Sequence, residues 1–195
     1  MARPRSFDPD AVLAAALELF WTKGYRATSF DDITRVTGIN KPSLYAAFGD
    51  KPALFAQVLG RYHAMLLMHA TGLLAGEGPA RAAIEAWLTS FLPSCSGAAG
   101  GRGCLSVNTT LEAATVDDPG VAKLIKSHNR KIEKLLAAAI QRGIAAGELA
   151  GTIEPAAAAR LLLTTQTGLM VLARDRPNAA TTKATMLHAL RVLDA

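Results

Sequence analysis

The chain has 195 residues, of which 50% are hydrophobic, so it is long enough for one large or two small domains with a proper core. Its net charge of +5 permits a nucleic-acid partner without establishing one, because residues 1–56 hold seven Lys and Arg against six Asp and Glu. The sequence has no secretory signal and no apolar run of roughly 18 residues, so it predicts a cytoplasmic protein without a membrane-spanning segment.

The first predicted helix begins after Asp8, a natural N-cap, and has Pro9 in its first turn. It ends at Gly24. Before it, Arg3 and Arg5 lie in a short basic arm. Arms of this kind can enter the minor groove of DNA, although a solvated tail is an equal alternative.

Two short helices separated by a glycine turn follow. Ser29 is the N-cap of the first, Asp32 stands where it completes a capping box, and Gly38 ends the helix where a positive φ is needed. Asn40 is the N-cap of the second, whose first turn tolerates Pro42. This pattern predicts a helix-turn-helix, with the second helix entering the major groove. The alternative is an ordinary helical hairpin.

The second of these helices has an inner and an outer side. Leu44 and Phe48 lie four residues apart and can dock it against the rest of the domain. Lys41, Ser43 and Tyr45 are then free to point outward. A small, polar and cationic first turn suits contacts to phosphates and base edges.

Long helices make up the remainder of the chain. A helix from Lys51 to about Leu74 is roughly 36 Å long and can connect two domains as a lever. Further helices are predicted at 79–93, 104–115, 119–147, 155–172 and 181–193, with a mobile Gly-rich loop at 94–103. No strand pattern is present, so we predict an all-α fold of about nine helices.

The last two helices are apolar enough to form a two-fold four-helix interface, with intrachain packing as the alternative. A ligand cavity is expected where polar groups interrupt apolar helices. The candidate ligand-binding residues are Trp87, Phe91, Cys104, Asn108, Leu111, His128, Gln166 and Met170. The candidate dimer residues are Leu161, Thr165, Gly168, Leu172, Leu187 and Leu190.

Three other functions stay open on the residues alone. Cys95 and Cys104 could form a thiol sensor, although two cysteines are not a disulfide framework. Soft ligands on one helix face would suit a metal sensor, although methionine at such spacing is usually core; these are Met65, Met68 and His69. A small helical enzyme using Cys104 or His128 lacks any nucleophile–base motif, phosphate loop or metal tetrad. We therefore predict no catalytic residue, no cofactor and no metal site.

The N-terminal part resembles the TetR/AcrR family of bacterial transcription regulators from Ala15 to Phe55. The matching segments, in order, are Ala16-Leu17-Glu18-Leu19-Phe20, Lys23-Gly24-Tyr25, Ala27-Thr28-Ser29, Asp31-Asp32-Ile33, Val36-Thr37-Gly38-Ile39, Ser43-Leu44-Tyr45, Phe48-Gly49-Asp50-Lys51 and Ala53-Leu54-Phe55. Each segment is weak alone, but the ordered set at these spacings is specific.

The resemblance implies a three-helix DNA-binding domain at 1–56 and a ligand-binding and dimerisation domain at 57–195. It further implies a homodimeric repressor released from a palindromic operator in double-stranded DNA by an unidentified small molecule. Pro42, where a small residue is frequent, and Ala47, where His or Asn is common, depart from the family pattern. The candidate DNA-binding residues are Ser29, Lys41, Pro42, Ser43, Tyr45 and Lys51, with Arg3 and Arg5 from the arm.

Overall fold

The computed structural model describes residues 7–95, 101–112 and 118–194. Arg3 and Arg5, half of the predicted loop at 94–103 and the last part of the predicted helix at 104–115 lie outside these residues. Within the described part every regular element is a helix, which confirms the all-α prediction.

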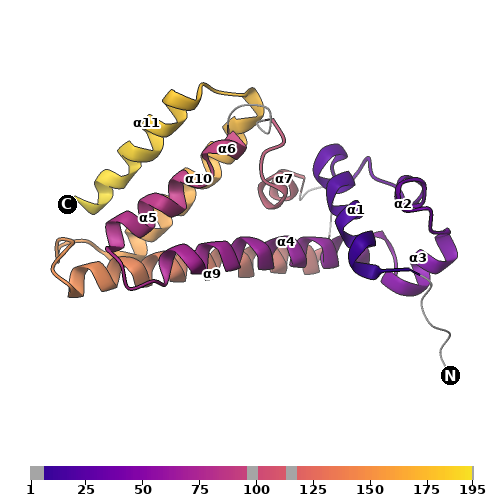
Figure 1. The fold of residues 1–195 in the computed structure, drawn as a ribbon, viewed down its shortest axis with the longest axis horizontal. Helices are drawn as coiled ribbons and strands as arrows, with labels where there is room; N and C mark the ends of the chain where they lie inside the picture. The colour runs from indigo at the N-terminus through magenta and orange to yellow at the C-terminus, as the bar shows by residue number, and fades with distance from the viewer. Residues whose placement is uncertain (1–6, 96–100, 113–117, 195) are drawn as a thin grey trace.

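The N-terminal head contains α1 (Pro9–Lys23), α2 (Phe30–Thr37) and α3 (Lys41–Phe48), drawn at the right of Figure 1. Their ends follow from local side-chain chemistry. The carboxylate of Asp8 accepts the N–H of Asp10, and the amide oxygen of Asn40 accepts the N–H of Ser43. Gly38 adopts φ 71°, a left-handed conformation that costs glycine little. The predicted caps are therefore confirmed.

The head has its own small core. Leu44 and Phe48 are buried, as predicted, and turn α3 so that its opposite side is exposed. Phe20 of α1 packs edge-on against Phe55 of α4, with ring centroids 4.8 Å apart. Val36 of α2 is 58% exposed, because the eight residues of α2 bury only one side.

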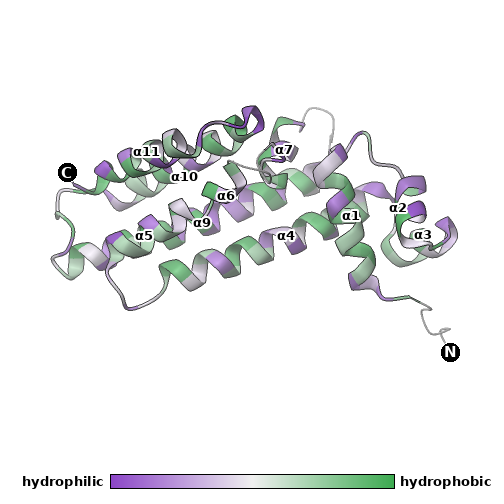
Figure 2. Cartoon of the chain, turned by 45° about the horizontal axis from the view of Figure 1, so that its top comes forward, coloured by the Kyte–Doolittle hydropathy of each residue, from purple (hydrophilic) through white to green (hydrophobic). Residues whose placement is uncertain are grey.

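The body is built on two long helices, α4 (Lys51–Leu74) and α9 (Pro119–Ala145), which run side by side in Figures 1 and 2. Hydrophobic residues recur along both helices with polar residues between them, as Figure 2 shows. α4 belongs to both parts of the molecule, because its first turns pack on α1 and its later turns on α5 and α9. The predicted domain boundary after Ala56 falls inside this unbroken helix and stays a prediction.

Shorter helices cover the long pair. They are α5 (Ala80–Thr89), α6 (Leu92–Cys95), α7 (Leu105–Leu111), α10 (Pro155–Leu172) and α11 (Ala179–Ala189), with 3₁₀ turns at Ala173–Asp175 and Leu190–Leu193. α7 lies between the body and α1, and α10 and α11 form the side farthest from α4 in Figure 1. Gly143 of α9 allows α5 to approach closely, because a Cβ there would lie 2.8 Å from the Cβ of Ala80.

Two predicted helix boundaries are wrong. The helix expected to reach Pro93 ends at Thr89, and a separate turn of helix follows at Leu92–Cys95. Pro93 has no N–H to donate back to Thr89, so it fits the first turn of a new helix and not the last of an old one. The final helix begins at Ala179, because Asn178 caps it with its side-chain oxygen.

Pro155–Asp175, which contains α10, is long and apolar enough to cross a membrane by length and hydropathy alone. In the fold, α10 packs along α9 and α11, so one side of it belongs to the core of the body.

Candidate DNA-binding surface and ligand cavity

The outer side of α3 carries the residues predicted to contact DNA. Lys41, Pro42 and Tyr45 are exposed, and Ser43 is half-buried. The amine of Lys41 lies 2.7 Å from a carboxylate oxygen of Asp31 in α2, which orients the lysine across the two helices. This contact raises the pKa of Lys41, so the side chain keeps its positive charge.

Tyr45 is held by aromatic packing. Its ring is stacked on that of Phe30, with centroids 4.3 Å apart and planes within 2° of each other. Phe30 is buried at the start of α2, whereas Tyr45 is 51% exposed. The stack therefore fixes the tyrosine ring while leaving part of it available to a partner.

Ser29 and Lys51 are placed differently from the α3 residues. The hydroxyl of Ser29 donates to Asp32 and accepts the N–H of Asp32, so it is used in the capping box. The amine of Lys51 lies 4.5 Å from the ring centroid of Tyr25 and donates to the carbonyl of Arg26 at 3.3 Å. In this conformation both residues stabilise the head itself.

Asp32 is the electrostatic centre of α2. Lys23 lies 2.7 Å and Arg35 3.1 Å from one of its carboxylate oxygens. Hydrogen bonds from Lys23 and Ser29 hold the pKa of Asp32 well below its usual range, so the carboxylate stays ionised. These contacts tie α2 to α1 and fix the orientation of the helix-turn-helix.

A small cavity of about 40 Å³ lies in the body beside α7, and we call it the α7 cavity. Five of the eight predicted ligand-binding residues line it: Trp87, Phe91, Cys104, His128 and Gln166. The remaining lining residues are Leu66, Ser106, Val107, Asn129, Ile132, Leu163 and Thr167. The cavity therefore joins side chains from α4, α5, α7, α9 and α10.

The other three predicted ligand-binding residues do not line this cavity. Leu111 is 61% exposed, because α7 ends there and its last two residues are exposed. Asn108 donates to the carbonyl of Arg102 at 2.8 Å and lines a separate polar hollow next to α1. Met170 is buried in the core one turn beyond Gln166.

Sequence reasoning missed His63, which stands beside the cavity. Its ring is stacked on that of His128 with centroids 4.2 Å apart, and its Nε2 lies 2.8 Å from Ser106 Oγ. Burial lowers the pKa of His63 to about 3 and that of His128 to about 4, with Lys131 adding to both shifts. Both imidazoles are therefore neutral at pH 7. The position of His63 in α4 gave no signal that could have found this pair, because its partner lies in a different helix.

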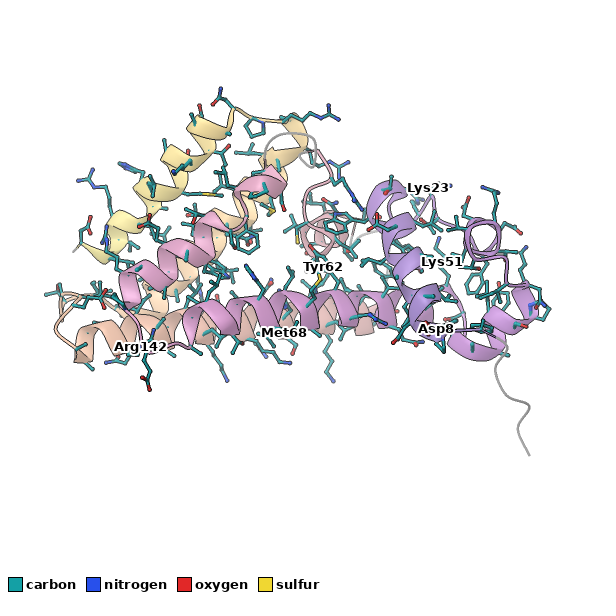
Figure 3. All side chains as sticks on the ribbon, viewed as in Figure 1. Asp8, Lys23, Lys51, Tyr62, Met68 and Arg142 are labelled. Atoms are coloured by element: carbon teal, nitrogen blue, oxygen red, sulfur yellow. The ribbon has the colours of Figure 1, made fainter. Side chains whose placement is uncertain are left out.

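Tyr62 adds a second contact between α4 and the cavity wall. It is buried and points towards α7 in Figure 3, where its hydroxyl donates to Cys104 Sγ at 3.4 Å. Burial and the neighbouring Cys104 raise the pKa of Tyr62, so the hydroxyl keeps its proton. Through Tyr62 and His63, α4 contacts both ends of the Cys104–Ser106 segment.

The head also contacts the body directly at the end of α1. Trp21 Nε1 donates to the carbonyl of Gly103 at 3.0 Å, and the guanidinium of Arg102 lies 4.3 Å from the centre of the Trp21 ring. Arg102 also pairs with Glu18 at 2.8 Å, and Glu112 accepts the N–H of Tyr25 at 3.1 Å. The segment that lines the α7 cavity is therefore joined to the N-terminal head.

Comparisons with known proteins fit this arrangement. Residues 12–58 match the bacterial regulatory proteins of the tetR family, and residues 78–187 match the tetracyclin repressor-like C-terminal domain. The chain is 31% identical to the transcriptional repressor ComR of Escherichia coli, over 89% of this chain and 82% of that protein. It is 52% identical to the repressor BdcR of Escherichia coli over 31% of this chain and 30% of that protein.

A solved structure gives the same relationship in three dimensions. The TetR family regulator CifR, as a cysteine mutant complexed with 26 bp of double-strand operator DNA, superposes with a TM-score of 0.82. Its sequence is 31% identical, and the match covers 97% of this chain and 98% of that chain. The chain belongs to the TetR family.

Membership of the TetR family identifies the class of protein. TetR-family proteins are DNA-binding transcription regulators that act as homodimers, and they are not enzymes. The family assignment thus confirms the regulator reading and excludes the small helical enzyme. It leaves the effector of this TetR-family protein unspecified.

The side of this TetR-family body farthest from α4 carries the predicted dimer residues. Leu161 is 48% and Leu172 is 55% exposed, while Leu187 and Gly168 are exposed and Thr165 is half-buried. Leu190 is buried in its own chain, because the final 3₁₀ turn folds it inward, so we remove it from the candidate interface. Large apolar side chains at the surface of α10 and α11 are typical of a protein–protein contact.

The thiol and metal alternatives find little support in the geometry. Cys95 and Cys104 are both buried, and burial raises the pKa of the Cys95 thiol to about 11, which makes it a poor nucleophile. Met68 points away from the body in Figure 3, and Met65 and His69 are exposed too. In the part of the chain that the structure describes, no group of three His, Cys, Asp or Glu side chains could hold a metal ion.

Proposed function

We propose that this TetR-family regulator is a cytoplasmic repressor that binds a palindromic operator as a homodimer and is released by a small molecule bound in the α7 cavity. The observation that carries the proposal is the exposed side of α3, where Lys41 and Tyr45 are oriented by Asp31 and Phe30 but not buried. A capped helix with such a side presented outward suits the major groove.

The proposed contacts differ in kind. Lys41 and Ser43, in the first turn of α3, lie near base edges, and Pro42 shapes that turn. Tyr45 holds a phosphate through its hydroxyl. Ser29 and Lys51 hold phosphates at the edges of the motif, with Lys51 leaving the Tyr25 ring for the DNA. Arg3 and Arg5 enter the neighbouring minor groove.

The homodimer supplies the second head. Leu161, Gly168 and Leu172 of α10 face the same side chains of the partner, with Thr165 and Leu187 beside them, in a two-fold four-helix contact. Two heads roughly 34–36 Å apart then read the two half-sites of a palindrome. The exposed apolar side chains on α10 support this arrangement.

Release follows from a change in the α7 cavity. A ligand larger than the present space must push α4, α9 and α10 apart or move α7. Because α4 begins in the head and the segment leading into α7 is joined to α1 through Trp21 and Gly103, such a movement changes the position of the head. The ligand acts only if it binds the released conformation more tightly than the DNA-binding one.

The test is a genomic DNA selection with the purified protein at physiological salt. We expect one palindromic motif, and we expect the Lys41→Ala/Tyr45→Ala variant to lose it. The control is Lys134→Ala, which removes an exposed lysine about four helical turns beyond the start of α9, the end that lies near Tyr25 of the head. Weak, salt-sensitive binding without sequence preference by the unmodified protein would contradict the proposal, as would an unchanged motif and affinity in the head variant.

A further inference from the structure

We infer that the α7 cavity selects an uncharged small molecule with one amide, carbonyl or hydroxyl group, which Gln166 and His128 bind by hydrogen bonds against the apolar wall around Trp87. The inference rests on the proposed function, because it names the chemical class of the effector for the same site. It depends on three features of the cavity: its lining, its unpaired polar groups and its size.

The lining contains no charged side chain. Six lining residues are apolar, and the polar ones are a thiol, two hydroxyls, two amides and an imidazole. Burial keeps the imidazole of His128 neutral at pH 7. An ion entering the cavity would lose its hydration without gaining an opposite charge, which is strongly unfavourable. The lining therefore discriminates against carboxylates and ammonium groups alike.

Two buried polar groups face this space without partners. Gln166 is 7% and His128 is 9% exposed, and neither side chain makes a hydrogen bond to another described residue; their polar atoms are not fully enclosed, so solvent in the cavity can reach them. The contact of His128 with His63 is a ring stack, which leaves the imidazole nitrogens available. Buried polar groups are nearly always hydrogen-bonded in folded proteins. A ligand that supplies a donor and an acceptor would take the place of the solvent at these two groups.

Two aromatic rings belong to the same lining as Gln166 and His128. Trp87 and Phe91 pack edge to face, with ring centroids 5.4 Å apart, and both line the cavity. Trp87 is fully buried and fixed, whereas Phe91 is half-buried between α5 and α6. The apolar part of the ligand therefore contacts Trp87, and Phe91 is the side chain that can move aside for a larger body.

The present volume restricts what enters without movement. About 40 Å³ of space holds roughly three water molecules, or a polar fragment of similar size. A larger uncharged ligand needs the walls to separate. Such a ligand therefore favours a conformation different from the one described, which is the requirement for a ligand that controls DNA binding.

The position of His128 gives the ligand a route to the head. His128 stacks on His63 of α4, and His63 is hydrogen-bonded to Ser106 at the start of α7. A ligand that hydrogen-bonds to His128 and turns or shifts its ring also disturbs the stack. The disturbance reaches α4, which packs on α1, and the segment leading into α7, whose Gly103 accepts a hydrogen bond from Trp21.

The experiment uses two sets of three molecules each. The three molecules of a set have nearly the same shape, and one is neutral, one is an anion and one is a cation. Acetamide, acetate and acetamidinium form the small set, and benzamide, benzoate and benzamidinium form the large set. Binding to the full chain is measured by ligand-observed NMR at pH 7.5. We expect the amide of at least one set to bind at least tenfold more tightly than the matching anion and cation.

Two variants assign the binding to the cavity. Gln166→Leu keeps the size of the side chain and removes its hydrogen bonds, and we expect it to abolish binding of the amide. His128→Phe keeps a ring for the stack on His63, and we expect it to weaken binding severalfold. Gln141→Leu, the same change at an exposed position on α9, should have no effect.

Several results would overturn the inference. These are equal or tighter binding of an anion or cation, amide binding that survives Gln166→Leu, and failure of both amides to bind. Operator affinity is measured on the same preparations, without and with the amide. Loss of operator recognition by the unmodified protein contradicts the proposed function. Intact recognition without amide binding contradicts only the effector class.

Discussion

Tyr45 combines two tasks on one side chain, and substitutions can separate them. Its ring is stacked on Phe30, while its hydroxyl has no hydrogen-bond partner among the described residues. Tyr45→Phe keeps the stack, so we expect unchanged thermal stability but about tenfold weaker operator binding, from the loss of one phosphate hydrogen bond of roughly 1.4 kcal/mol. Tyr45→Ala should lower both the thermal stability and the affinity for the operator. Unchanged operator affinity in Tyr45→Phe, measured by mobility shift, would remove the hydroxyl from the proposed contacts.

The histidine pair makes stability depend on pH. The pKa is about 3 for His63 and about 4 for His128 in the fold, against about 6.5 for an unfolded histidine. Below pH 6.5 the unfolded chain binds protons that the folded chain does not. The free energy of unfolding therefore has its full value above pH 6.5 and falls as the pH drops from 6.5 towards 4. We expect urea unfolding to show this fall.

Replacing both rings should flatten that dependence. His63→Phe/His128→Phe is expected to lose most of the difference in stability between pH 7.5 and pH 5, whereas the same change at exposed His69 and His188 should keep it. Asp32 lowers the free energy of unfolding only at a lower pH than the histidines do, because its pKa is lowered from an ordinary value that is already near 4. An unaltered slope in the double variant would contradict the burial of the pair.

At the scale of the element, α2 depends on its capping box. Ser29 accepts the N–H of Asp32, and the Asp32 carboxylate accepts the N–H of Ser29 at 3.0 Å. Ser29→Ala removes the hydroxyl that accepts the N–H of Asp32, so we expect a loss of about 1 kcal/mol in the free energy of unfolding. Ser29→Thr keeps the acceptor and serves as the control. Equal stability of the Ala and Thr variants, by urea unfolding, would show that the cap is not used.

Helix ends could be predicted from the sequence where one side chain decides them. Asp8, Ser29 and Asn40 all cap the helices that their positions indicated, because a cap depends only on residues two or three positions away. The end of α5 was misjudged, since Pro93 was read as a stop when it belongs to the start of α6.

Which side of a helix is buried depends on partners distant in sequence. Leu190 and Leu187 are three positions apart on an apolar segment, yet one is buried and the other exposed. The stack of His63 on His128 joins residues 65 positions apart along the chain, and periodicity within one helix could not reveal it. The DNA-facing residues of α3 were accessible to sequence reasoning because Leu44 and Phe48 fix its inner side.

At the scale of the molecule, the exposed leucines of α10 provide a test of assembly. We expect Leu161→Glu/Leu172→Glu to convert a dimer into a monomer in sedimentation velocity, because four carboxylates would meet at a two-fold contact. Operator affinity should fall strongly, since each head alone reads half a palindrome. Leu111→Glu, an equally exposed leucine on α7, should leave the dimer intact. A double variant that still sediments as a dimer would place the interface elsewhere.

The chain's two tryptophans stand at the two ends of the proposed signal path. Trp87 is buried in the wall of the α7 cavity, and Trp21 lies at the contact between head and body, beneath the guanidinium of Arg102. Indole emission responds to polarity and to nearby charge. The protein therefore carries an intrinsic optical reporter at each site, and Trp21→Phe and Trp87→Phe assign the signal to the joint or to the cavity. Mixing ligand with each single-tryptophan protein in a stopped-flow instrument would time the arrival of the change at the head.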